Sequence, residues 1–382
     1  MPAELRAVPS VPGVLEAADV RLTAASIAAA QEPDGAIPWT VGQHTDVWNH
    51  VEAAMGLLVG GEVEAAERAY AWCVATQRLD GSWPMRTVAG VVEDASGETN
   101  MSAYLAVGVW HHWLVRHDEE FVRRHWPAVR RGLDWVVSMQ LPFGGVAWSQ
   151  EWSGDRPARV NEHALLSGSS SIHQSLRAGC ALAALVGEPQ PAWELAGGRL
   201  GHALREHRDL FLDKSEFSMD WYYPVLGGAV RGEAAHSLIE GRWDDFVEPD
   251  LGVRCVDTSP WVTGAETCEL VLALDAVGHR DAAARLFADM QHLRHDDGGY
   301  WTGYVFPDEA VWPQERTTWT AAAVLLAADA LGGGTPGADI MRGTTLPDFA
   351  EPDLAGPDLA GPGPGCGCDS ADRVPGVPAG TP

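Results

Sequence analysis

The sequence predicts an all-α protein whose helices pair into a single (α/α)6 toroid, an inner ring of helices inside an outer ring. Two observations predict this fold. Helical segments follow one another in pairs joined by short turns, and a turn motif recurs where one pair leads to the next. The motif is a Gln, an Asp-Gly or Gly-Gly turn and a Trp, and it is clearest at Gln77–Trp83. Related stretches begin at Gln31, Gln140 and Gln291. A motif that recurs at one point of a repeating unit indicates a repeat architecture.

Apolar residues recur at helical spacing in twelve segments, which make six pairs. Between them we expect no strand apart from a short extended piece at residues 252–256. The boundaries between segments carry helix-end signals. For example, Gly60-Gly61 is a C-cap signal between the segments 46–58 and 63–77. In chain order the helical segments are residues 14–31, 46–58, 63–77, 99–115, 120–140, 169–186, 192–206, 218–230, 234–243, 262–277, 280–293 and 317–331.

The two rings differ in composition. Residues 101–109 and 320–326 are apolar nearly all round, which is typical of a helix buried on every side. Residues 121–140 are amphipathic and carry Arg123 and Arg130 on one face, which is typical of an outer helix. We therefore expect the segment that follows each motif to lie in the inner ring.

The chain divides into three parts by composition. Residues 1–13 form an N-terminal lead, residues 14–331 the barrel, and residues 332–382 a tail rich in Pro and Gly that we expect to be disordered, because it has little apolar surface to bury. Cys366 and Cys368 in that tail could bind a metal or form a redox pair. Two thiols in such a tail are a weak signal, and we favour no role for them.

Charge and cysteine usage limit the partners. The chain has 26 Lys and Arg against 53 Asp and Glu, a formal net charge of -27, which disfavours nucleic acid and anionic membrane surfaces. No apolar run is long enough for a membrane span, and the N-terminus lacks the pattern of a signal peptide. Four scattered cysteines are typical of buried thiols in a reduced compartment, so we expect a cytoplasmic protein. A single lysine, Lys214, indicates the codon bias of a GC-rich bacterium.

The connections predict which end of the barrel carries a site. Inner-to-outer connections are short, as at residues 60–62 and 278–279, whereas outer-to-inner connections are long and carry the Gln–Trp motifs. Because connections of one kind lie on one rim, the long connections together form an elaborated rim, where binding sites are usually built.

Aromatic residues and carboxylates gather in the long connections. Trp and Tyr faces stack on sugar rings and carboxylates bind hydroxyls, so we expect a saccharide as the substrate. We expect no cofactor and no metal, because the histidines show no ligand spacing. The candidate substrate-binding residues are Trp39, Asp46, Trp48, His50, Trp148, His173, Asp220, Tyr222, Trp261, Glu266, Trp301, Tyr304 and Trp312.

The chain resembles the six-hairpin glycosidase superfamily, most closely its glucoamylase-like members. The stretches that carry the resemblance are Gln77–Trp83, residues 98–104 and residues 117–129. It implies a glycoside hydrolase in which Glu151, within Trp148-Ser149-Gln150-Glu151-Trp152, is the general acid and Glu315 the general base. Hydrolysis would then be inverting, with the two carboxyls about 6.5–9.5 Å apart. The sequence departs from the superfamily at residues 45–50, where a Trp-Arg-Asp entry is usual.

Three alternatives remain open. The chain also resembles actinobacterial toroid proteins labelled prenyltransferase, which would imply an isoprenoid substrate and a deep apolar cavity. It has no Asp-X-Asp-Asp acid and no matching zinc set, and Asp244–Glu248 matches a diphosphate motif only formally. A sugar epimerase with His173 as base, or a lyase, is the second alternative. A saccharide-binding toroid without activity is the third.

Overall fold

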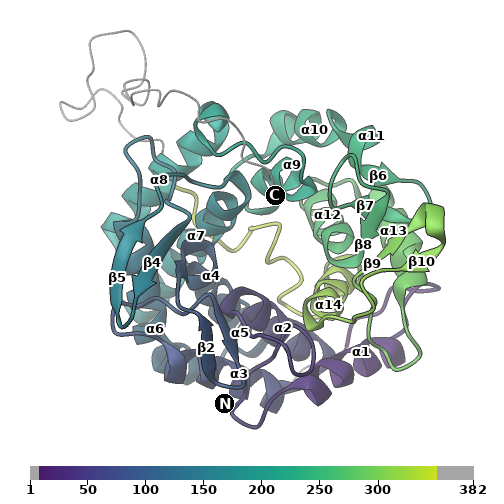
Figure 1. The fold of residues 1–382 in the computed structure, drawn as a ribbon, viewed down its shortest axis with the longest axis horizontal. Coiled ribbons are helices and arrows are strands. Elements are labelled where there is room, and N and C mark those ends of the chain that lie inside the picture. The colour runs from purple at the N-terminus through teal and green to yellow at the C-terminus, as the bar shows by residue number, and fades with distance from the viewer. Residues whose placement is uncertain (1–7, 351–382) are drawn as a thin grey trace.

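The computed structural model describes residues 8–350, and it consists of helical hairpins arranged as two concentric rings (Figure 1). Short helical turns occur at α11 (Trp243–Phe246) and in three 3₁₀ segments. The inner ring consists of α2 (Val47–Gly60), α4 (Thr99–Ala103) continued by α5 (Leu105–Arg116), α7 (Leu166–Val186), α9 (Ser218–Leu226), α12 (Gly264–Ala276) and α14 (Thr318–Gly332). The outer ring consists of α1 (Ala17–Ala30), α3 (Val63–Thr76), α6 (Glu119–Ser138), α8 (Pro191–Glu206), α10 (Gly232–Glu240) and α13 (Arg280–Asp289).

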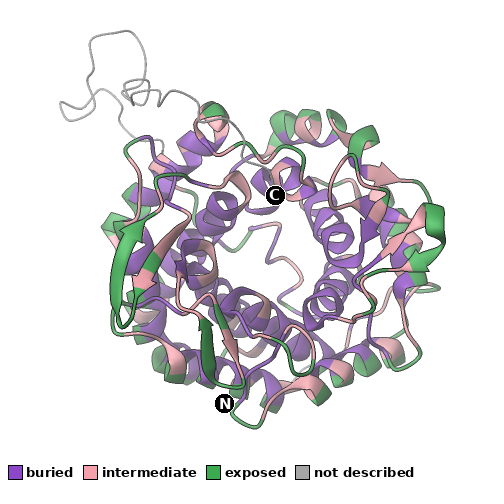
Figure 2. Ribbon diagram, viewed as in Figure 1, coloured by how far each residue is buried: buried purple, intermediate pink, exposed green. Residues whose placement is uncertain are grey.

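The inner ring closes on itself. Each inner helix packs on the next, and α14 returns to pack on α2. The inner helices are buried almost throughout, while the outer helices expose their outward faces (Figure 2). The predicted (α/α)6 toroid is confirmed. Among residues 8–350, no helix has both the length and the apolar character needed to cross a membrane.

The prediction that only one extended piece would interrupt the helices is wrong. Short strands occupy the long outer-to-inner connections, in sheets of two, three and five strands with the orders β1-β2, β3-β4-β5 and β10-β9-β8-β7-β6. Most of them form short hairpins within one connection, whereas β3 with β4 and β8 with β9 join connections far apart in the chain. Strands of two to five residues are too short to show a clear alternation in the sequence. The strands are β1 (Arg86–Val88), β2 (Val91–Asp94), β3 (Gly97–Glu98), β4 (Ser149–Ser153), β5 (Arg156–Val160), β6 (Val247–Glu248), β7 (Gly252–Arg254), β8 (Trp261–Thr263), β9 (Gly303–Val305) and β10 (Ala310–Val311).

The glutamine of the recurring motif joins neighbouring outer helices. Gln77 follows α3, and its side-chain amide donates to the Gly81 carbonyl of its own turn and to the Ala128 carbonyl of α6, both at 2.9 Å. Gln31 makes the same two bonds to its turn and to α3, and Gln140 to its turn and to α8. Gln291 differs, because its amide donates within its own helical segment.

The turn glycine of each motif lets the outer helices approach. Gly81 has φ +100° and lies against the backbone of Arg131 on α6, where an added Cβ would collide with a carbonyl. Gly35 and Gly144 have φ of +100° and +103° and press against the backbone of the next outer helix in the same way. Only glycine combines this backbone conformation with this contact. The motif is therefore part of the scaffold, as a joint between hairpins.

A C-terminal strap, residues 333–350, closes the toroid at the end where the inner helices terminate; in Figure 1 its yellow trace crosses the ring. Arg177 of α7 donates to the carbonyls of Leu346 and Pro347, and Arg342 pairs with Asp275 of α12. Met341 is buried at the centre of the ring, among side chains of the inner helices. The expectation of disorder from residue 332 is therefore wrong for the strap, because the buried Arg177 of the barrel binds its backbone and Arg342 of the strap pairs with Asp275. The rest of the tail, with Cys366 and Cys368, lies outside the described residues.

We predict that Gln77→Ala lowers the free energy of unfolding by about 2 kcal/mol, because two buried carbonyls lose their donor. Chemical denaturation monitored by circular dichroism measures the change. Gln314→Ala is the control, since Gln314 is exposed and should tolerate the loss with a change below about 0.5 kcal/mol. Equal losses of unfolding free energy in the two variants would contradict the role of Gln77 as a joint between hairpins.

Candidate active site

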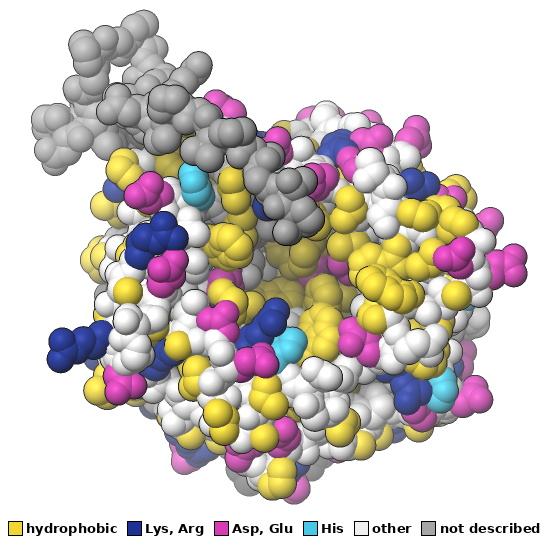
Figure 3. All heavy atoms as spheres, viewed as in Figure 1, with side chains coloured by type: hydrophobic (Ala, Val, Ile, Leu, Met, Phe, Trp, Pro, Cys, Tyr) yellow, Lys and Arg dark blue, Asp and Glu magenta, His cyan; other side chains and the backbone are white. Residues whose placement is uncertain are grey.

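A pocket of about 220 Å³ opens at the mouth of the toroid, where the inner helices begin. The space-filling view shows it as a hollow at the centre of the ring (Figure 3). It lies on the rim of the long connections, as the connection lengths predicted. The residues that line it are Trp39, Trp48, Asn49, Glu98, Asn100, Met101, Leu165, Ser167, Gly168, Met219, Tyr223 and Trp319.

The same positions of successive inner helices face this pocket. The second and third residues of α2 line it, which are Trp48 and Asn49, and so do the second and third residues of α4 and of α7. The third residue of α12 is Glu266, which is 6% exposed. Glu266 thus has the same helical register as Asn49, Met101 and Gly168, but it is not among the residues that line the pocket.

Three tryptophans form one wall. Trp39 packs on Trp319 with ring centroids 5.6 Å apart, and Trp48 meets Trp319 edge-on at 6.1 Å. Trp48 also stacks on Tyr104 at 4.6 Å. These rings offer the broad apolar faces on which sugar rings stack.

The sixth residues of five inner helices form a second layer directly beneath the pocket. The space between them is about 10 Å³, close to the minimum for one water molecule. Trp48 and Tyr223 line both this space and the pocket, so the two spaces are adjacent. The layer consists of Glu52, Tyr104, Ser171, Tyr223 and Glu269.

Burial favours the neutral form of the two glutamates of this layer. Burial raises the pKa of Glu52 to about 8, and a hydrogen bond from Tyr104 opposes the rise. Burial and the nearby Glu52 raise the pKa of Glu269 well above its usual value. Tyr222 and Tyr223 both donate to Glu269, the latter at 2.6 Å. The layer is therefore a ring of hydroxyl and carboxyl groups under the pocket floor.

Two further carboxyls meet at the starts of α2 and α4. Glu98 caps α4 by accepting from the Met101 amide at 3.0 Å, and Asp46 caps α2 by accepting from the Asn49 amide at 2.9 Å. Burial raises the pKa of Glu98 to about 8, and the neighbouring charge of Asp46 adds to the rise. Glu98 lines the pocket. It is thus a proton donor at neutral pH that faces any bound ligand.

Several polar atoms in these two layers have no hydrogen-bond partner among the described residues. They include Nε1 of Trp319 and Oδ1 of Asn100 in the pocket, and Oε1 of Glu52 below it. A buried polar atom without a partner is costly. Such atoms at a pocket wall indicate a polar ligand that supplies the missing bonds.

The two carboxylates predicted to be catalytic lie in different surroundings. Glu315 precedes α14 and accepts a bond of 3.1 Å from Nε1 of Trp39, which lines the pocket. Glu151 lies on β4, where its side chain is 54% exposed and pairs with Arg159 of β5 at 2.7 Å. Glu151 does not line the pocket. An exposed, ion-paired carboxylate on a hairpin is poorly placed to protonate a ligand on the axis.

The predicted histidines belong to the packing between helices. His50 is fully buried between Ile37 and Ala69, with a ring nitrogen 3.0 Å from the Ile37 amide and the other 2.8 Å from the Ala69 carbonyl. His173 lies 3.1 Å from the Gly227 carbonyl, and burial lowers its pKa to about 3. Neither histidine lines the pocket. The epimerase alternative with His173 as base is therefore unsupported.

The remaining candidates surround the pocket at several levels. Trp39 and Trp48 line it as expected. Asp220 accepts from the amide of the lining residue Ser167, and Tyr222 lies one layer down on Glu269. Trp148 precedes β4. Trp301 packs under Arg316, whereas Trp261, Tyr304 and Trp312 lie on or beside the five-stranded sheet at the mouth.

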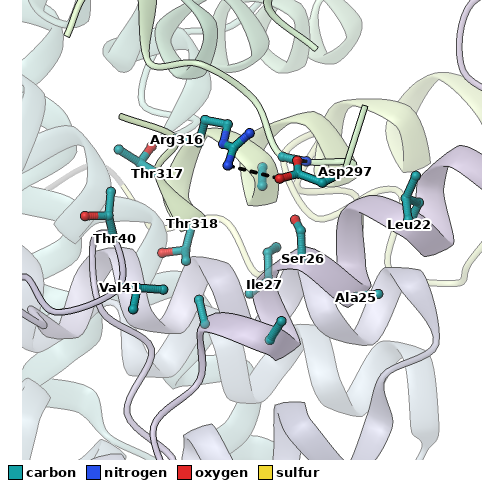
Figure 4. A pocket seen from close by; sticks show the side chains of 14 residues that line it. Leu22, Ala25, Ser26, Ile27, Thr40, Val41, Asp297, Arg316, Thr317 and Thr318 are labelled. Carbon is teal, nitrogen blue, oxygen red and sulfur yellow. Dashed lines mark hydrogen bonds and ion pairs between the residues drawn. The ribbon is translucent and has the colours of Figure 1, made fainter. Parts of the chain in front are cut away.

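A second pocket, of about 380 Å³, lies off the axis between α1 and the start of α14 (Figure 4). Arg316 and Asp297 lie side by side at its edge and pair at 3.0 Å. Ser26, Thr40 and Thr318 add hydroxyls. Its charged groups satisfy one another, so it lacks the unpaired acids of the axial pocket. Among residues 8–350 no cluster of metal-binding side chains is found.

Sequence reasoning did not single out Glu98, Asn49, Glu52 or Glu269 as site residues. For Asn49, Glu52 and Glu269 the signal that could have found them is helical register, because they are third or sixth residues of inner helices; Glu98 is instead the N-cap of α4. Applying it requires the first residue of each helix. Helix starts are uncertain by a residue or two from sequence alone, and a shift of one residue turns each helix by about 100°.

A comparison with known proteins finds a relative whose enzyme activity is named. The chain is 57% identical over 344 residues to the MMP endo-(1,4)-3-O-methyl-alpha-D-mannosidase of Mycolicibacterium hassiacum, covering 90% of this chain and 94% of that protein. No protein-family model matches the chain.

Solved structures share the fold at low identity. A wild-type glycosidase has a TM-score of 0.65 at 16% identity, over 82% of this chain and 96% of that one. A GH63 mannosylglycerate hydrolase of Thermus thermophilus has a TM-score of 0.61 at 16% identity, over 80% and 99%. A D-mannose isomerase has a TM-score of 0.64 at 9% identity, over 81% and 95%. The six-hairpin glycosidase resemblance is confirmed. The prenyltransferase resemblance is not supported, and the pocket is lined by an acid and amides as well as rings.

The buried acids predict that folding stability falls as pH rises. Glu52 has a usual pKa of 4.5 and a pKa of about 8 in the fold, so the folded chain binds more protons between these values. The stability from this proton is present below pH 4.5 and is lost as pH rises to about 8, at up to about 1.4 kcal/mol per pH unit. Glu52→Gln should flatten the dependence, measured by urea denaturation from about pH 5 to 8. Glu151→Gln, an exposed control, should keep the wild-type slope, and an unchanged slope in Glu52→Gln would contradict the assignment.

Proposed function

The chain belongs to the family of the MMP endo-(1,4)-3-O-methyl-alpha-D-mannosidase and is a glycoside hydrolase, and we propose that it cleaves internal 1,4 linkages of a 3-O-methyl-α-D-mannose chain. The identity to that relative supports the substrate class. The lining of the pocket supports it independently, because Met101, Leu165 and Met219 add apolar surface to the tryptophan wall. An O-methylated sugar presents more apolar surface than an unmethylated one, and such a lining suits it.

The single observation that carries the mechanism is the position and protonation of Glu98. This carboxyl lines the pocket, and with a pKa of about 8 it retains its proton at neutral pH. A general acid in a glycosidase must hold a proton and deliver it to the leaving oxygen. We assign this role to Glu98, in place of the exposed Glu151.

Glu266 is suited to be the general base. The order of the inner ring is α2, α4 with α5, α7, α9, α12 and α14, so α12 lies opposite α4. Inverting glycosidases place their acid and base on opposite sides of the sugar, about 6.5–9.5 Å apart, with room for a water. Burial raises the pKa of Glu266, and hydrogen bonding partly opposes the rise.

The proposed reaction is a single displacement. Glu98 gives its proton to the glycosidic oxygen, which leaves as a hydroxyl group. A water oxygen bonds to the anomeric carbon from the other side, and its proton passes to Glu266. An α-linked substrate then gives a β-configured product first. Glu315 holds the Trp39 ring through their 3.1 Å bond, a positioning role in place of the general base that the superfamily resemblance implied.

We place the reaction in the cytoplasm. Cys73, Cys180, Cys255 and Cys268 are all free thiols. Burial raises the pKa of each, which is typical of unreactive cysteines in a reduced compartment.

We predict that Glu98→Gln and Glu266→Gln each lower kcat by about 10²–10⁴-fold on an oligosaccharide of α-1,4-linked 3-O-methyl-D-mannose, because each removes a proton-transfer group. Reducing-end release measures kcat, and thermal denaturation confirms folding. Glu151→Gln is the matched control and should keep wild-type kcat. Proton NMR of the first product should show the β anomer. Retention of the α anomer, or a loss confined to Glu315→Gln, would contradict the assignment.

The effect of the Asp46 charge on Glu98 gives a pH prediction. Burial is the main cause of the raised pKa of Glu98, and the charge of Asp46 adds to it. Asp46→Asn removes this charge, so the pKa of Glu98 falls and the acid loses its proton at lower pH. The alkaline limb of the kcat profile should therefore move to lower pH. Glu93→Gln, at an exposed carboxylate of β2, should leave the limb in place. A shift to higher pH would overturn this arrangement.

A further inference from the structure

Trp261 and Trp312 form an aromatic platform on the five-stranded sheet beside the mouth of the toroid. We propose that this platform is a surface subsite that stacks a sugar unit of the substrate chain outside the pocket. The inference rests on the proposed function, because it requires a saccharide chain longer than the pocket can enclose.

The platform is built to hold its shape. Nε1 of Trp261 donates to the Trp312 carbonyl at 2.7 Å, and the two rings meet edge-on with centroids 5.1 Å apart. Trp261 lies across Gly303 of the neighbouring strand β9, where an added Cβ would collide with the Trp261 ring and the Val262 carbonyl. Glycine at this position therefore allows the indole to lie on the sheet. The Trp261 ring is held in place before any ligand arrives, so little of its side-chain entropy is lost on binding.

The platform is exposed where a chain leaving the pocket would pass. Trp312 is 56% exposed, which is unusual for so large an apolar side chain. Figure 3 shows hydrophobic side chains gathered beside the central hollow, over β8, β9 and β10. β8 leads directly into α12, so Trp261 precedes Glu266 by five positions, and Trp312 precedes Glu315 by three. The platform is thus joined to two walls of the site.

The chemistry of the platform favours a neutral, partly apolar saccharide. An indole face packs on the C–H and O-methyl groups of a sugar ring. The net charge of -27 disfavours an anionic partner. An endo-acting enzyme must also hold sugar units on both sides of the cleaved bond, and a pocket of about 220 Å³ can enclose only a small part of such a chain. A second contact outside the pocket is therefore required, and this platform is the exposed aromatic surface next to the mouth.

The test compares long and short substrates in Trp312→Ala. For an oligosaccharide of about ten 3-O-methylmannose units, we expect KM to rise about tenfold, the loss of one aromatic stacking contact. For the shortest cleaved oligosaccharide we expect KM and kcat to stay within about twofold, because the backbone carbonyl that holds Trp261 remains. Trp312→Phe should restore most of the long-substrate KM. Leu79→Ala is the control, since Leu79 is a fully exposed apolar side chain on the same rim.

Each other outcome has a definite meaning. An equal rise of KM for long and short substrates would show a structural role and overturn the subsite. A change of oligomeric state in Trp312→Ala, measured by sedimentation, would overturn it too, by showing that the platform contacts a second copy of the chain. If Trp312→Ala folds as the wild type does and its KM for the long substrate is unchanged, the platform is not a subsite, and the proposed function is unaffected. If the wild-type chain neither binds nor cleaves these oligosaccharides, the proposed function itself fails.

Discussion

The interaction on which the structure depends is the double hydrogen bond of the motif glutamine. At Gln31, Gln77 and Gln140 one amide nitrogen closes its own turn and reaches the next outer helix. The amide can reach both carbonyls only because a glycine with positive φ brings the turn against that helix. Three successive hairpins are joined in this way. Each of these joints precedes the connection that leads to the next inner helix.

The axis of the ring then determines the chemistry. Inner helices pack side by side, so residues at and near their starts converge on the axis, and the carboxyls among them are buried. Desolvation raises the pKa values of Glu52, Glu98 and Glu269 because it penalises the charged form. Burial in a closed ring of helices thus favours the protonated form of these glutamates, which is the form that the proposed general acid needs. Burial of these carboxyls lowers the stability of the fold at high pH. The hydroxyls of Tyr222 and Tyr223 offset part of this loss by donating hydrogen bonds to Glu269.

The strap gives the ring a floor and the sheets give it a rim. Arg177 and Arg342 bind the strap to α7 and α12, and Met341 closes the space under the deep layer. On the opposite side, strands from distant connections pair into small sheets that hold Trp261 and Trp312 beside the mouth. The pocket is therefore closed below and open above. A polymer can reach it only across the rim, which is where the aromatic surface lies.

The sequence by itself determined the toroid, the rim that carries the site and the saccharide class. Helical periodicity, short connections and the repeated glutamine are local patterns, which can be recognised without knowledge of tertiary packing. Trp39 and Trp48 were also expected near the site and line the pocket, because aromatic residues in long connections are conspicuous. Tertiary structure decided the rest. Glu98 faces the pocket while Glu151 faces solvent, and both are glutamates near strands in long connections. Their difference arises from strand pairing and helix register across the ring. The strap likewise became ordered through Arg177, whose partners lie about 170 residues away in the chain.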